Sequence, residues 1–469
     1  TQFLQYGPAV LRVPLPQSSI EPVRGLTPPL NAEYAPAPLD SVSLFNGVLK
    51  FDHEFAVVSD AEIEWVVQEL SDMLGPYLSD LEVLLPEEAA ELLVEETASG
   101  IPYSHLYGTR KGDVLKKVPA QRLWMDFLEY DQVISCTLKD ELRPVGKDSR
   151  LFRPANVACI LAGIMLFEDM NMKLAKARRE TPYKIGVATP GLEMVNFWRE
   201  CLRFSSCAVS ADGSQWDAHF QPWMVRVCCE FRCKYLPLTA PYVADVHGAV
   251  HRYYSQMYYG WTRVDGQLIR LVGNPSGHFN TASDNTLALI ASYLLVARRL
   301  HIPKRDIWLA CYGDDSIFST RNLRFSGRSV REEMATLGVW LETIGDEYTP
   351  RDSLVFIGTH PVMSEYGWVF SYDPEKLAAS MWWRKKKASD LDYVRKLVAL
   401  CVLCRFSPRY KLLWEWTTKL VSAKWPAYIT ELQFGAPNKC VDLYLNLECQ
   451  REGWETVLSE LAWSDWRCS

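Results

Sequence analysis

Apolar side chains recur at helical spacing in several segments of the chain. In residues 61–85 they recur every three or four positions, and Ser59 or Asp60 is a suitable N-cap in front of them. Pro86 suits the first turn of a helix, so a second helix is expected over residues 86–96. Further helices are expected over residues 156–177, 221–236 and 281–300, and the pattern is mostly helical from about residue 374 onwards.

Other segments have the pattern of strands or of extended chain. Strands are expected over residues 206–211, 307–312 and 316–319, and the last two frame an acidic turn. Residues 257–274 are expected to form a hairpin, because Asp265-Gly266 is a strong turn signal between two strand-like runs. Residues 1–40 contain eight prolines, which favour an extended strap lying over the rest of the molecule.

The composition indicates a large globular protein. The chain has 469 residues, of which 48% are apolar, so two or three subdomains around sizeable cores are expected. The net charge of −7 excludes a wholly basic nucleic-acid coat but not a basic channel inside the protein. The longest apolar run, residues 287–297, is too short to span a bilayer. The chain starts at Thr1 without a charged and apolar leader, so release from a longer precursor and trimming both remain open.

The cysteines indicate a reducing compartment. Their number, 13, is odd, and a chain of this size needs no disulfide staples, so reduced thiols are expected. Cys401 and Cys404 have no second pair at zinc spacing and are expected on a buried helix face.

Three acidic or polar motifs follow one another along the chain, at residues 212–217, 276–286 and 312–315. Taken alone, the Gly-Asp-Asp of the third motif could be a hairpin turn with Gly313 at positive φ and its carboxylates in water. Asp314, however, lies between apolar strands, where an uncompensated carboxylate would be costly. The two carboxylates of the turn and Asp212 could supply hard oxygen ligands for two Mg²⁺ ions, as in phosphoryl transfer.

The ordered motifs resemble those of the viral RNA-dependent RNA polymerases of the picornavirus-like supergroup, most of all the potyvirus and astrovirus enzymes. Asp212 and Asp217 resemble motif A, residues 276–286 motif B, and residues 312–315 motif C. The flanking resemblances are Ser99-Gly100-Ile101-Pro102 to motif G, Lys139–Arg143 with Lys147 and Arg150 to motif F, and residues 356–359 to motif E.

The resemblance implies a two-metal site for nucleotidyl transfer. Asp212 and Asp314 resemble the carboxylates that hold both metals, and Asp315 resembles an auxiliary ligand or outer-shell partner. The expected cofactor is a pair of Mg²⁺ ions, for which Mn²⁺ can substitute.

The resemblance also implies how the sugar is selected. Asp217 and Asn285 resemble the pair that reads the ribose 2′-hydroxyl, and Thr281 resembles the neighbour that supports them. Because this hydroxyl both donates and accepts, a carboxylate and an amide can hold it and reject a deoxyribose. Ser276 and Gly277 would form a flexible loop at the template and the nucleotide.

Basic residues would contact the triphosphate and the RNA. The set expected to line the path of the incoming nucleotide is Lys139, Arg143, Lys147 and Arg150. Without the resemblance, residues 135–153 would be a solvated basic loop broken by Pro144 and Gly146, and Ser99-Gly100 merely a turn. Near the C-terminus, Arg384, Lys385 and Lys386 either grip the product duplex or form the solvated face of a helix with buried tryptophans.

The fold implied is an α+β right hand, with a palm of antiparallel strands flanked by helices and with a helical thumb. The expected divisions are a strap and fingers (1–205), palm with motif A (206–221), a fingers and palm insertion (222–265), palm with motifs B to E (266–365) and thumb (366–469). The strap would join fingers to thumb and encircle the channel.

One stretch departs from the family pattern. Residues 337–354, which correspond to motif D, contain no lysine, and Arg351 is their only basic residue. Arginine is a poor proton donor, so the proton for the leaving pyrophosphate would come from a lysine elsewhere, from water or from no fixed acid. The structural alternative for Arg351 is a surface residue bonded to carboxylates such as Asp346 or Glu347.

The expected function is therefore that of an RNA-directed RNA polymerase, which adds nucleotides from NTPs to an RNA 3′-end and replicates and transcribes a viral genome. A reverse transcriptase would be expected to have a bulky group at the position of Asp217 or Asn285, to exclude the 2′-hydroxyl. A catalytically silent RNA-binding homologue would be expected to lack one of the metal carboxylates, and all three are present here. A two-metal nuclease gives no reason for the basic motif. The expected partners are an RNA template and product duplex, NTPs, a protein primer and other viral replication proteins, in replication complexes or virions of the host cytoplasm.

Overall fold

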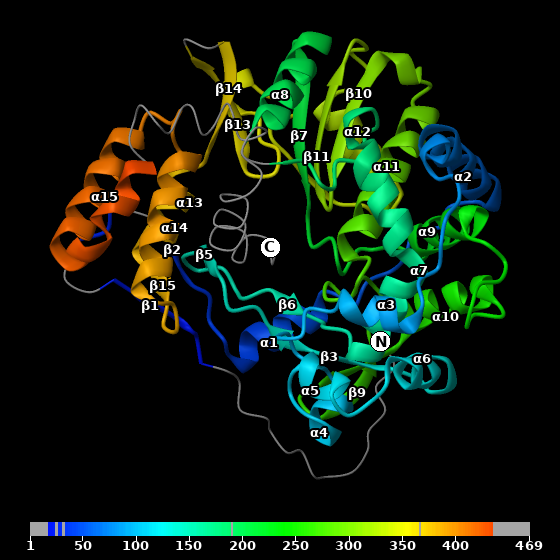
Figure 1. Cartoon of the computed structure of the whole chain (residues 1–469). Helices are drawn as coiled ribbons and strands as arrows, with labels where there is room; N and C mark the ends of the chain where they lie inside the picture. Colours follow the sequence, from blue (N-terminus) through cyan, green and yellow to red (C-terminus); the bar gives the residue numbers. More distant parts are fainter. Residues whose placement is uncertain (1–16, 24–26, 31–32, 189–190, 365–366, 435–469) are drawn as a thin grey trace.

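The computed structural model describes residues 17–23, 27–30, 33–188, 191–364 and 367–434 (Figure 1). The predictions made for Pro8, Pro14 and Pro16, and for the last part of the expected thumb, fall on residues outside these ranges. Helices and sheets are mixed along the chain. None of the helices in the described ranges combines the length and the apolar character needed to cross a membrane.

A four-stranded antiparallel sheet lies at the centre of the fold. Its strand order is β10-β11-β7-β12. The strands are β7 (Cys207–Gly213), β10 (Ile307–Tyr312), β11 (Asp315–Thr320) and β12 (Leu341–Thr343). Three of these four were predicted from the sequence, whereas β12 was not.

Both faces of this sheet are covered by helices. Alternate side chains of a strand point to opposite faces, so neighbouring residues of one strand join two different cores. Val209 and Phe318 join the larger core, together with residues of α7 (Val157–Lys176), α9 (Pro222–Tyr235), α10 (Val246–Tyr259) and α11 (Thr281–Arg299). Ala208 and Ile317 join a second core, together with residues of α8 (Leu192–Phe204), α13 (Pro374–Trp382), α14 (Asp390–Leu403) and α15 (Tyr410–Lys424). The ends of the sheet strands, where the acidic motifs lie, are thus fixed between two packed layers.

Most long helices agree with the hydrophobic pattern, and their ends have local causes. The Asn156 side chain accepts from Cys159 N and caps α7. Ser59 and Glu62 form a capping box at the start of α2 (Asp60–Leu74). The helix predicted over residues 61–85 was too long, because Gly75-Pro76 turns the chain into a 3-10 helix, η1 (Gly75–Tyr77). The helix predicted from Pro86 is also shorter, as α3 (Pro86–Glu91).

The hairpin predicted over residues 257–274 is present but starts later. Its strands are β8 (Trp261–Val264) and β9 (Gln267–Arg270), joined at Asp265-Gly266. Tyr258 was predicted to be in a strand but belongs to α10, because its side chain continues the buried face of that helix. β8 also pairs with β3 (Val133–Ser135).

The described parts of the N-terminal segment are extended and pair with two distant strands. β1 (Ile20–Pro22) pairs with β15 (Trp383–Lys385), and β2 (Tyr34–Pro36) pairs with β5 (Leu142–Pro144). The segment therefore connects the C-terminal helices to the basic segment around residue 143 (Figure 1). The helix considered for the tryptophan and lysine run is wrong from Trp383 onwards, since α13 ends at Trp382 and a strand follows.

Shorter elements complete the fold. The basic segment over residues 135–153 is not a plain loop, because β4 (Thr137–Leu138), β5 and β6 (Leu151–Phe152) lie within it. Cys401 is buried in α14 and Cys404 is buried at its C-cap, as predicted. The other helices are α1 (Ser41–Leu49), α4 (Tyr103–Leu106), α5 (Lys111–Leu115), α6 (Ala120–Glu129), α12 (Gly327–Thr336), η2 (Ala177–Arg179), η3 (Lys304–Asp306), η4 (Arg351–Ser353) and η5 (Pro426–Phe434). A hairpin of β13 (Thr359–Ser364) and β14 (Gly367–Tyr372) precedes α13.

Candidate active site

Two of the predicted metal carboxylates face each other across neighbouring strands. Asp212 of β7 is paired in register with Asp315 of β11. Asp314 occupies the turn that precedes Asp315, and its carbonyl accepts a 3.1 Å hydrogen bond from the backbone N–H of Gly213. Like charges directly opposite on a sheet are destabilising, so the fold holds these carboxylates together against their repulsion.

A fourth carboxylate lies on the other side of Asp212. Glu342 of β12 is paired in register with Asp212, and Ser214 Oγ donates to Glu342 Oε1 at 3.1 Å. Sequence reasoning missed Glu342, and only the pairing of β12 with β7 reveals its position.

The surroundings favour protonated or cation-bound carboxyl groups. Burial, Asp314 and Glu342 together raise the pKa of Asp212 to about 7. The pKa values of Asp314 and Asp315 are also raised, chiefly by burial, while Arg150 and Lys376 respectively oppose the shift. Carboxylate oxygens are hard donors that suit a divalent cation. A bound cation would compensate for the lost solvation of these carboxylates and for their mutual repulsion.

The turn that carries Asp314 is built on Gly313 and is tied to α11. β10 and β11 are joined by the two residues Gly313 and Asp314, and Gly313 has φ +61°, the left-handed region that suits such hairpins. The Gly313 N–H donates to Thr286 Oγ1 at 2.8 Å. Thr286 therefore couples the predicted motif B helix to the predicted motif C turn.

The residues predicted to read the ribose lie near one another and are linked by Asn274. Asp217 accepts a hydrogen bond from Ser276 Oγ, and Asn285 Oδ1 accepts one from Asn274 Nδ2. The backbone N–H of Asn274 donates to the Asp217 carbonyl at 2.8 Å, so this fully buried residue connects the two. Burial raises the pKa of Asp217 to about 6, against the lowering effect of its bond with Ser276.

Two motif B residues make contacts other than those expected. Thr281 Oγ1 donates to the His278 carbonyl at 2.9 Å, a contact within α11 and its preceding loop rather than with Asp217 or Asn285. Gly277 lies close to the backbone of Pro154, and its contact with the template and the nucleotide stays a prediction. A Cβ atom at Gly277 would lie 2.5 Å from the Pro154 Cα, and the Gly277 carbonyl accepts from Ala155 N at 3.1 Å.

Within the predicted basic set, Arg150 acts electrostatically on more of the acidic residues than any other member does. Its charge acts on Asp212, Asp217 and Asp314 and lowers their pKa values. Its guanidinium forms a forked ion pair with Glu141, with both N···O distances 2.6 Å. Sequence reasoning missed Glu141 as the partner that holds the fork.

The other members of the basic set differ in their surroundings. Lys139 acts on Asp217 and Asp314, whereas Lys147 is exposed. Arg143 is half-buried and lies 3.9 Å from Glu141. Lys376 of α13, which was not predicted, acts electrostatically on Asp315.

The predicted template residues of motif G are packed inward. Ser99 is buried, and its hydroxyl donates to the Gly108 carbonyl at 2.6 Å. Gly100 has φ +73°, and a Cβ atom there would lie 2.6 Å from the Asn156 Cα. This turn therefore supports the start of α7.

The predicted thumb contacts are engaged in the protein itself. The Arg384 guanidinium pairs with Asp390 at 3.0 Å and lies over the Tyr393 ring. Lys386 Nζ donates to the Ser18 carbonyl at 2.9 Å, and exposed Lys385 lies in β15 beside β1. Their backbone role beside the N-terminal segment was not apparent from the sequence.

Arg351 is an exposed residue of η4. The carboxylates proposed as its partners pair with other residues: Asp346 lies 2.7 Å from Arg331, and Glu347 lies 3.5 Å from Arg328.

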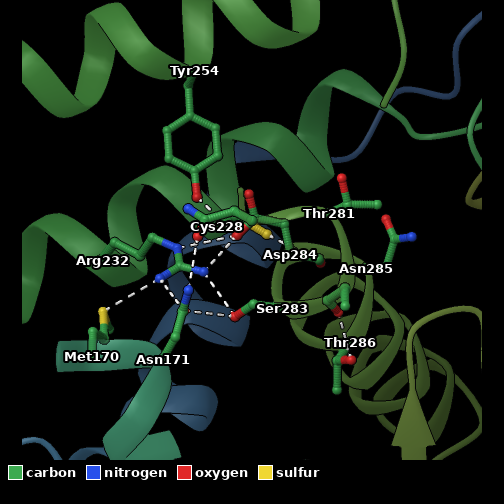
Figure 2. A network of polar contacts seen from close by, with 12 residues as sticks. Met170, Asn171, Cys228, Arg232, Tyr254, Thr281, Ser283, Asp284, Asn285 and Thr286 are labelled. Atoms are coloured by element: carbon green, nitrogen blue, oxygen red, sulfur yellow. Dashed lines mark hydrogen bonds and ion pairs between the residues drawn. The ribbon is translucent and has the colours of Figure 1, made fainter. Parts of the chain in front are cut away.

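A buried polar network surrounds Asp284, the residue before Asn285 (Figure 2). Figure 2 shows the Arg232 guanidinium of α9 facing Asp284 and Ser283 of α11 and Asn171 of α7. Arg232 Nη2 lies 2.7 Å from Asp284 Oδ1, and neither side chain is exposed to solvent. Asp284 also accepts from Tyr254 at 3.0 Å and from Tyr258 at 2.9 Å, both on α10. The residue before Asn285 is thus held by three donors from two helices.

Comparison with known proteins identifies the family. The profile of the family described as "Viral RNA-dependent RNA polymerase" matches residues 48–411. Genome polyprotein 1 of barley yellow mosaic virus (isolate Germany) is 24% identical over 401 residues, covering 78% of this chain and 16% of the polyprotein. The genome polyprotein of plum pox potyvirus (strain Rankovic) is 23% identical over 322 residues, covering 63% of this chain and 10% of the polyprotein. The chain thus spans under a fifth of these relatives, and the predicted resemblance to viral polymerases, including those of potyviruses, is confirmed.

Proposed function

Because the chain belongs to the viral RNA-dependent RNA polymerase family, we propose that it catalyses the RNA-templated addition of nucleotides to an RNA 3′-end. The observation that carries this proposal is the meeting of Asp212, Asp314 and Asp315 at adjoining ends of β7 and β11. Their raised pKa values are those of carboxyl groups that need a cation to be ionised together.

Polymerases of this family use divalent metal ions, and Mg²⁺ is the ion proposed here, with Mn²⁺ as a substitute. Asp212 and Asp314 would hold two ions, and Asp315 would be an auxiliary ligand. When bound, such a pair stabilises the attacking and leaving oxygens of phosphoryl transfer. Glu342, on the opposite side of Asp212, adds negative charge that draws cations to the site.

Asp217 and Asn285 are proposed to read the ribose 2′-hydroxyl, with Ser276 and Asn274 orienting their side chains. The 2′-hydroxyl would enter where Ser276 now satisfies Asp217, exchanging one hydrogen bond for another. Selection for ribose follows, since a deoxyribose would leave the carboxylate and the amide without this partner.

Arg150 is proposed as the principal triphosphate ligand, with Lys139 and Arg143 beside it. The N–H groups of its guanidinium donate to Glu141, so a triphosphate would compete with that carboxylate for the same donors. Lys147 is proposed to belong to the same set on the path of the nucleotide. Contacts with the RNA are proposed for Ser99, Gly100, Arg384, Lys385 and Lys386.

We propose the right-hand arrangement for the whole chain, with the central sheet as palm and α13 to α15 within the thumb. The pairing of β1 with β15 and of β2 with β5 supports a strap between thumb and fingers. The proposed partners are an RNA template and product duplex, NTPs, a protein primer and other viral replication proteins, in the host cytoplasm.

The proposal is tested by incorporation of labelled nucleotides on a primed RNA template, with and without Mg²⁺. Ribonucleotides should be added only with the metal present, and Asp314→Asn should abolish addition while leaving the thermal unfolding midpoint nearly unchanged. Asp265→Asn is the matched control, because Asp265 lies in the exposed turn between β8 and β9.

The alternatives give different results in the same assay. Equal or preferred addition of deoxyribonucleotides would indicate a reverse transcriptase, and RNA binding without addition would indicate a silent homologue. Shortening of the labelled strand would indicate a nuclease. Normal addition by folded Asp314→Asn would refute the assigned metal ligands.

A further inference from the structure

Two cysteines and a histidine converge where α9 packs on α10, away from the acidic cluster. Cys229 and Cys233 are four positions apart on α9, so their side chains lie on the same face of that helix. His251 lies on α10, and its Nδ1 is 3.4 Å from Cys229 Sγ. The two sulfur atoms and one ring nitrogen of His251 all lie within 4.8 Å of one another.

This separation suits ligands of one tetrahedral ion. With Zn–S of about 2.3 Å and Zn–N of about 2.1 Å, a tetrahedral angle places the sulfur and the nitrogen about 3.6 Å apart. The observed 3.4 Å is close to that distance, so a zinc ion could be accommodated with a small outward movement. Thiolate and imidazole ligands also bind zinc in preference to Mg²⁺, which favours oxygen ligands.

The three side chains have the access and chemistry that a metal site needs. His251 is exposed, Cys233 is half-buried and Cys229 is buried, so one side of the cluster is open to solvent. Both cysteines are free thiols.

We propose that Cys229, Cys233 and His251 bind a zinc ion, with the fourth position taken by water. The ion would connect α9 to α10. These are the helices that supply the donors to Asp284, since Arg232 lies on α9 and Tyr254 and Tyr258 lie on α10. The ion would therefore stabilise the packing of these two helices, and the proposal is independent of the polymerase function proposed above.

The test measures zinc in the full chain, purified with a reductant and with Mg²⁺ in excess to occupy the acidic cluster. Mass spectrometry of the metal content should give one zinc per chain after titration with Zn²⁺ and gel filtration. Cys233→Ser and His251→Gln should each weaken zinc binding at least 100-fold, beyond the roughly 10–100-fold cost of losing an outer-shell partner. His251→Gln should leave the fold intact because this side chain is exposed.

Matched controls come from the same chain. Cys207→Ser removes another half-buried thiol, and His105→Gln another exposed imidazole, and both should keep the zinc. With Co²⁺ in place of zinc, the wild type should show thiolate-to-metal absorption that Cys233→Ser reduces. Zinc should also raise the thermal midpoint of the wild type and not that of His251→Gln.

Three results would overturn the proposal. The first is a wild-type chain that retains no zinc after titration. The second is zinc that persists in Cys233→Ser but is lost in Asp212→Asn, which would place the ion in the acidic cluster. The third is a Cys229–Cys233 disulfide that forms and remains in the presence of zinc, which would make the pair a redox element instead.

Discussion

Replacing Asp284 by asparagine tests whether the buried network holds the start of α11 in place. Asp284 carries a charge with no solvent exposure, compensated by Arg232 at 2.7 Å. Tyr254 and Tyr258 donate to the same carboxylate. The substitution preserves the shape of the side chain but leaves the Arg232 guanidinium as an uncompensated buried cation.

The expected loss is large because water cannot reach the site. Removing one partner of a buried ion pair costs about 3–5 kcal/mol of folding stability. Arg232 retains hydrogen bonds to Ser283 and Asn171, at 2.9 and 3.0 Å, which places the expected loss at the lower end of that range, about 3 kcal/mol.

Denaturation with urea, followed by circular dichroism, measures this loss. Asp346→Asn is the control, since Asp346 pairs with Arg331 in an exposed position and its midpoint should hardly change. Single-nucleotide turnover is then measured at a temperature at which Asp284→Asn is fully folded. Turnover should fall and discrimination against deoxyribonucleotides should weaken, because Asn285 and Thr286 follow Asp284 directly. Wild-type stability together with wild-type turnover and sugar selection would refute the reasoning.

Three further substitutions test the site from other sides. Asn285→Ala should reduce the preference for ribonucleotides, as a ratio of kcat/KM values, by an amount equivalent to about 1–3 kcal/mol, and an unchanged ratio would make Asn285 structural. Thr286→Val removes the acceptor of the buried Gly313 N–H, so it should lower stability by about 1–3 kcal/mol and reduce kcat, whereas Thr286→Ser should restore both. His278 is buried, and this burial lowers its pKa to about 3, so stability should be lost as the pH falls below about 6.5, where only the unfolded chain gains the proton. His278→Gln should therefore lose less stability between pH 7 and pH 5, by about 2 kcal/mol in the free energy of unfolding measured by denaturation, and parallel profiles would contradict the pKa direction.

The elements whose causes are local could be predicted from the sequence. The caps at Ser59 and Asn156 and the apolar spacing behind them define α2 and α7 at their N-terminal ends. The turn at Gly313 follows from two strand-like runs around a residue that tolerates positive φ. The end of α2 was missed because the helical spacing of apolar residues continues past Gly75-Pro76. The restriction that Pro76 places on the backbone before it outweighs that spacing.

The partners that complete the candidate site could not be predicted in the same way. Glu342 lies beside Asp212 only because β12 pairs with β7, and its position depends on a strand register that no local pattern in residues 337–354 reveals. Arg232 and Asp284 are separated by 52 positions, and nothing in the sequence of α9 distinguishes Arg232 from Arg226 or indicates which carboxylate it will meet. The cluster of Cys229, Cys233 and His251 likewise needs the packing of α10 on α9, although the four-residue spacing of the cysteines was a signal in the sequence.

The basic run after Trp383 shows why side-chain composition alone could not decide between its two interpretations. Both interpretations concerned what the lysine side chains do, whereas the fold uses the backbone: Lys385 is paired with Ile20, and Lys386 N donates to the Ser19 carbonyl. Lys386 Nζ reaches the Ser18 carbonyl, 368 positions away in the sequence. Because the entropic cost of closing a loop grows only slowly with its length, such a distant strand pair is accessible to the chain once β15, between α13 and α14, is extended. The extended conformation of the N-terminal segment could thus be predicted from its prolines, but the strand it pairs with could be identified only from the structure.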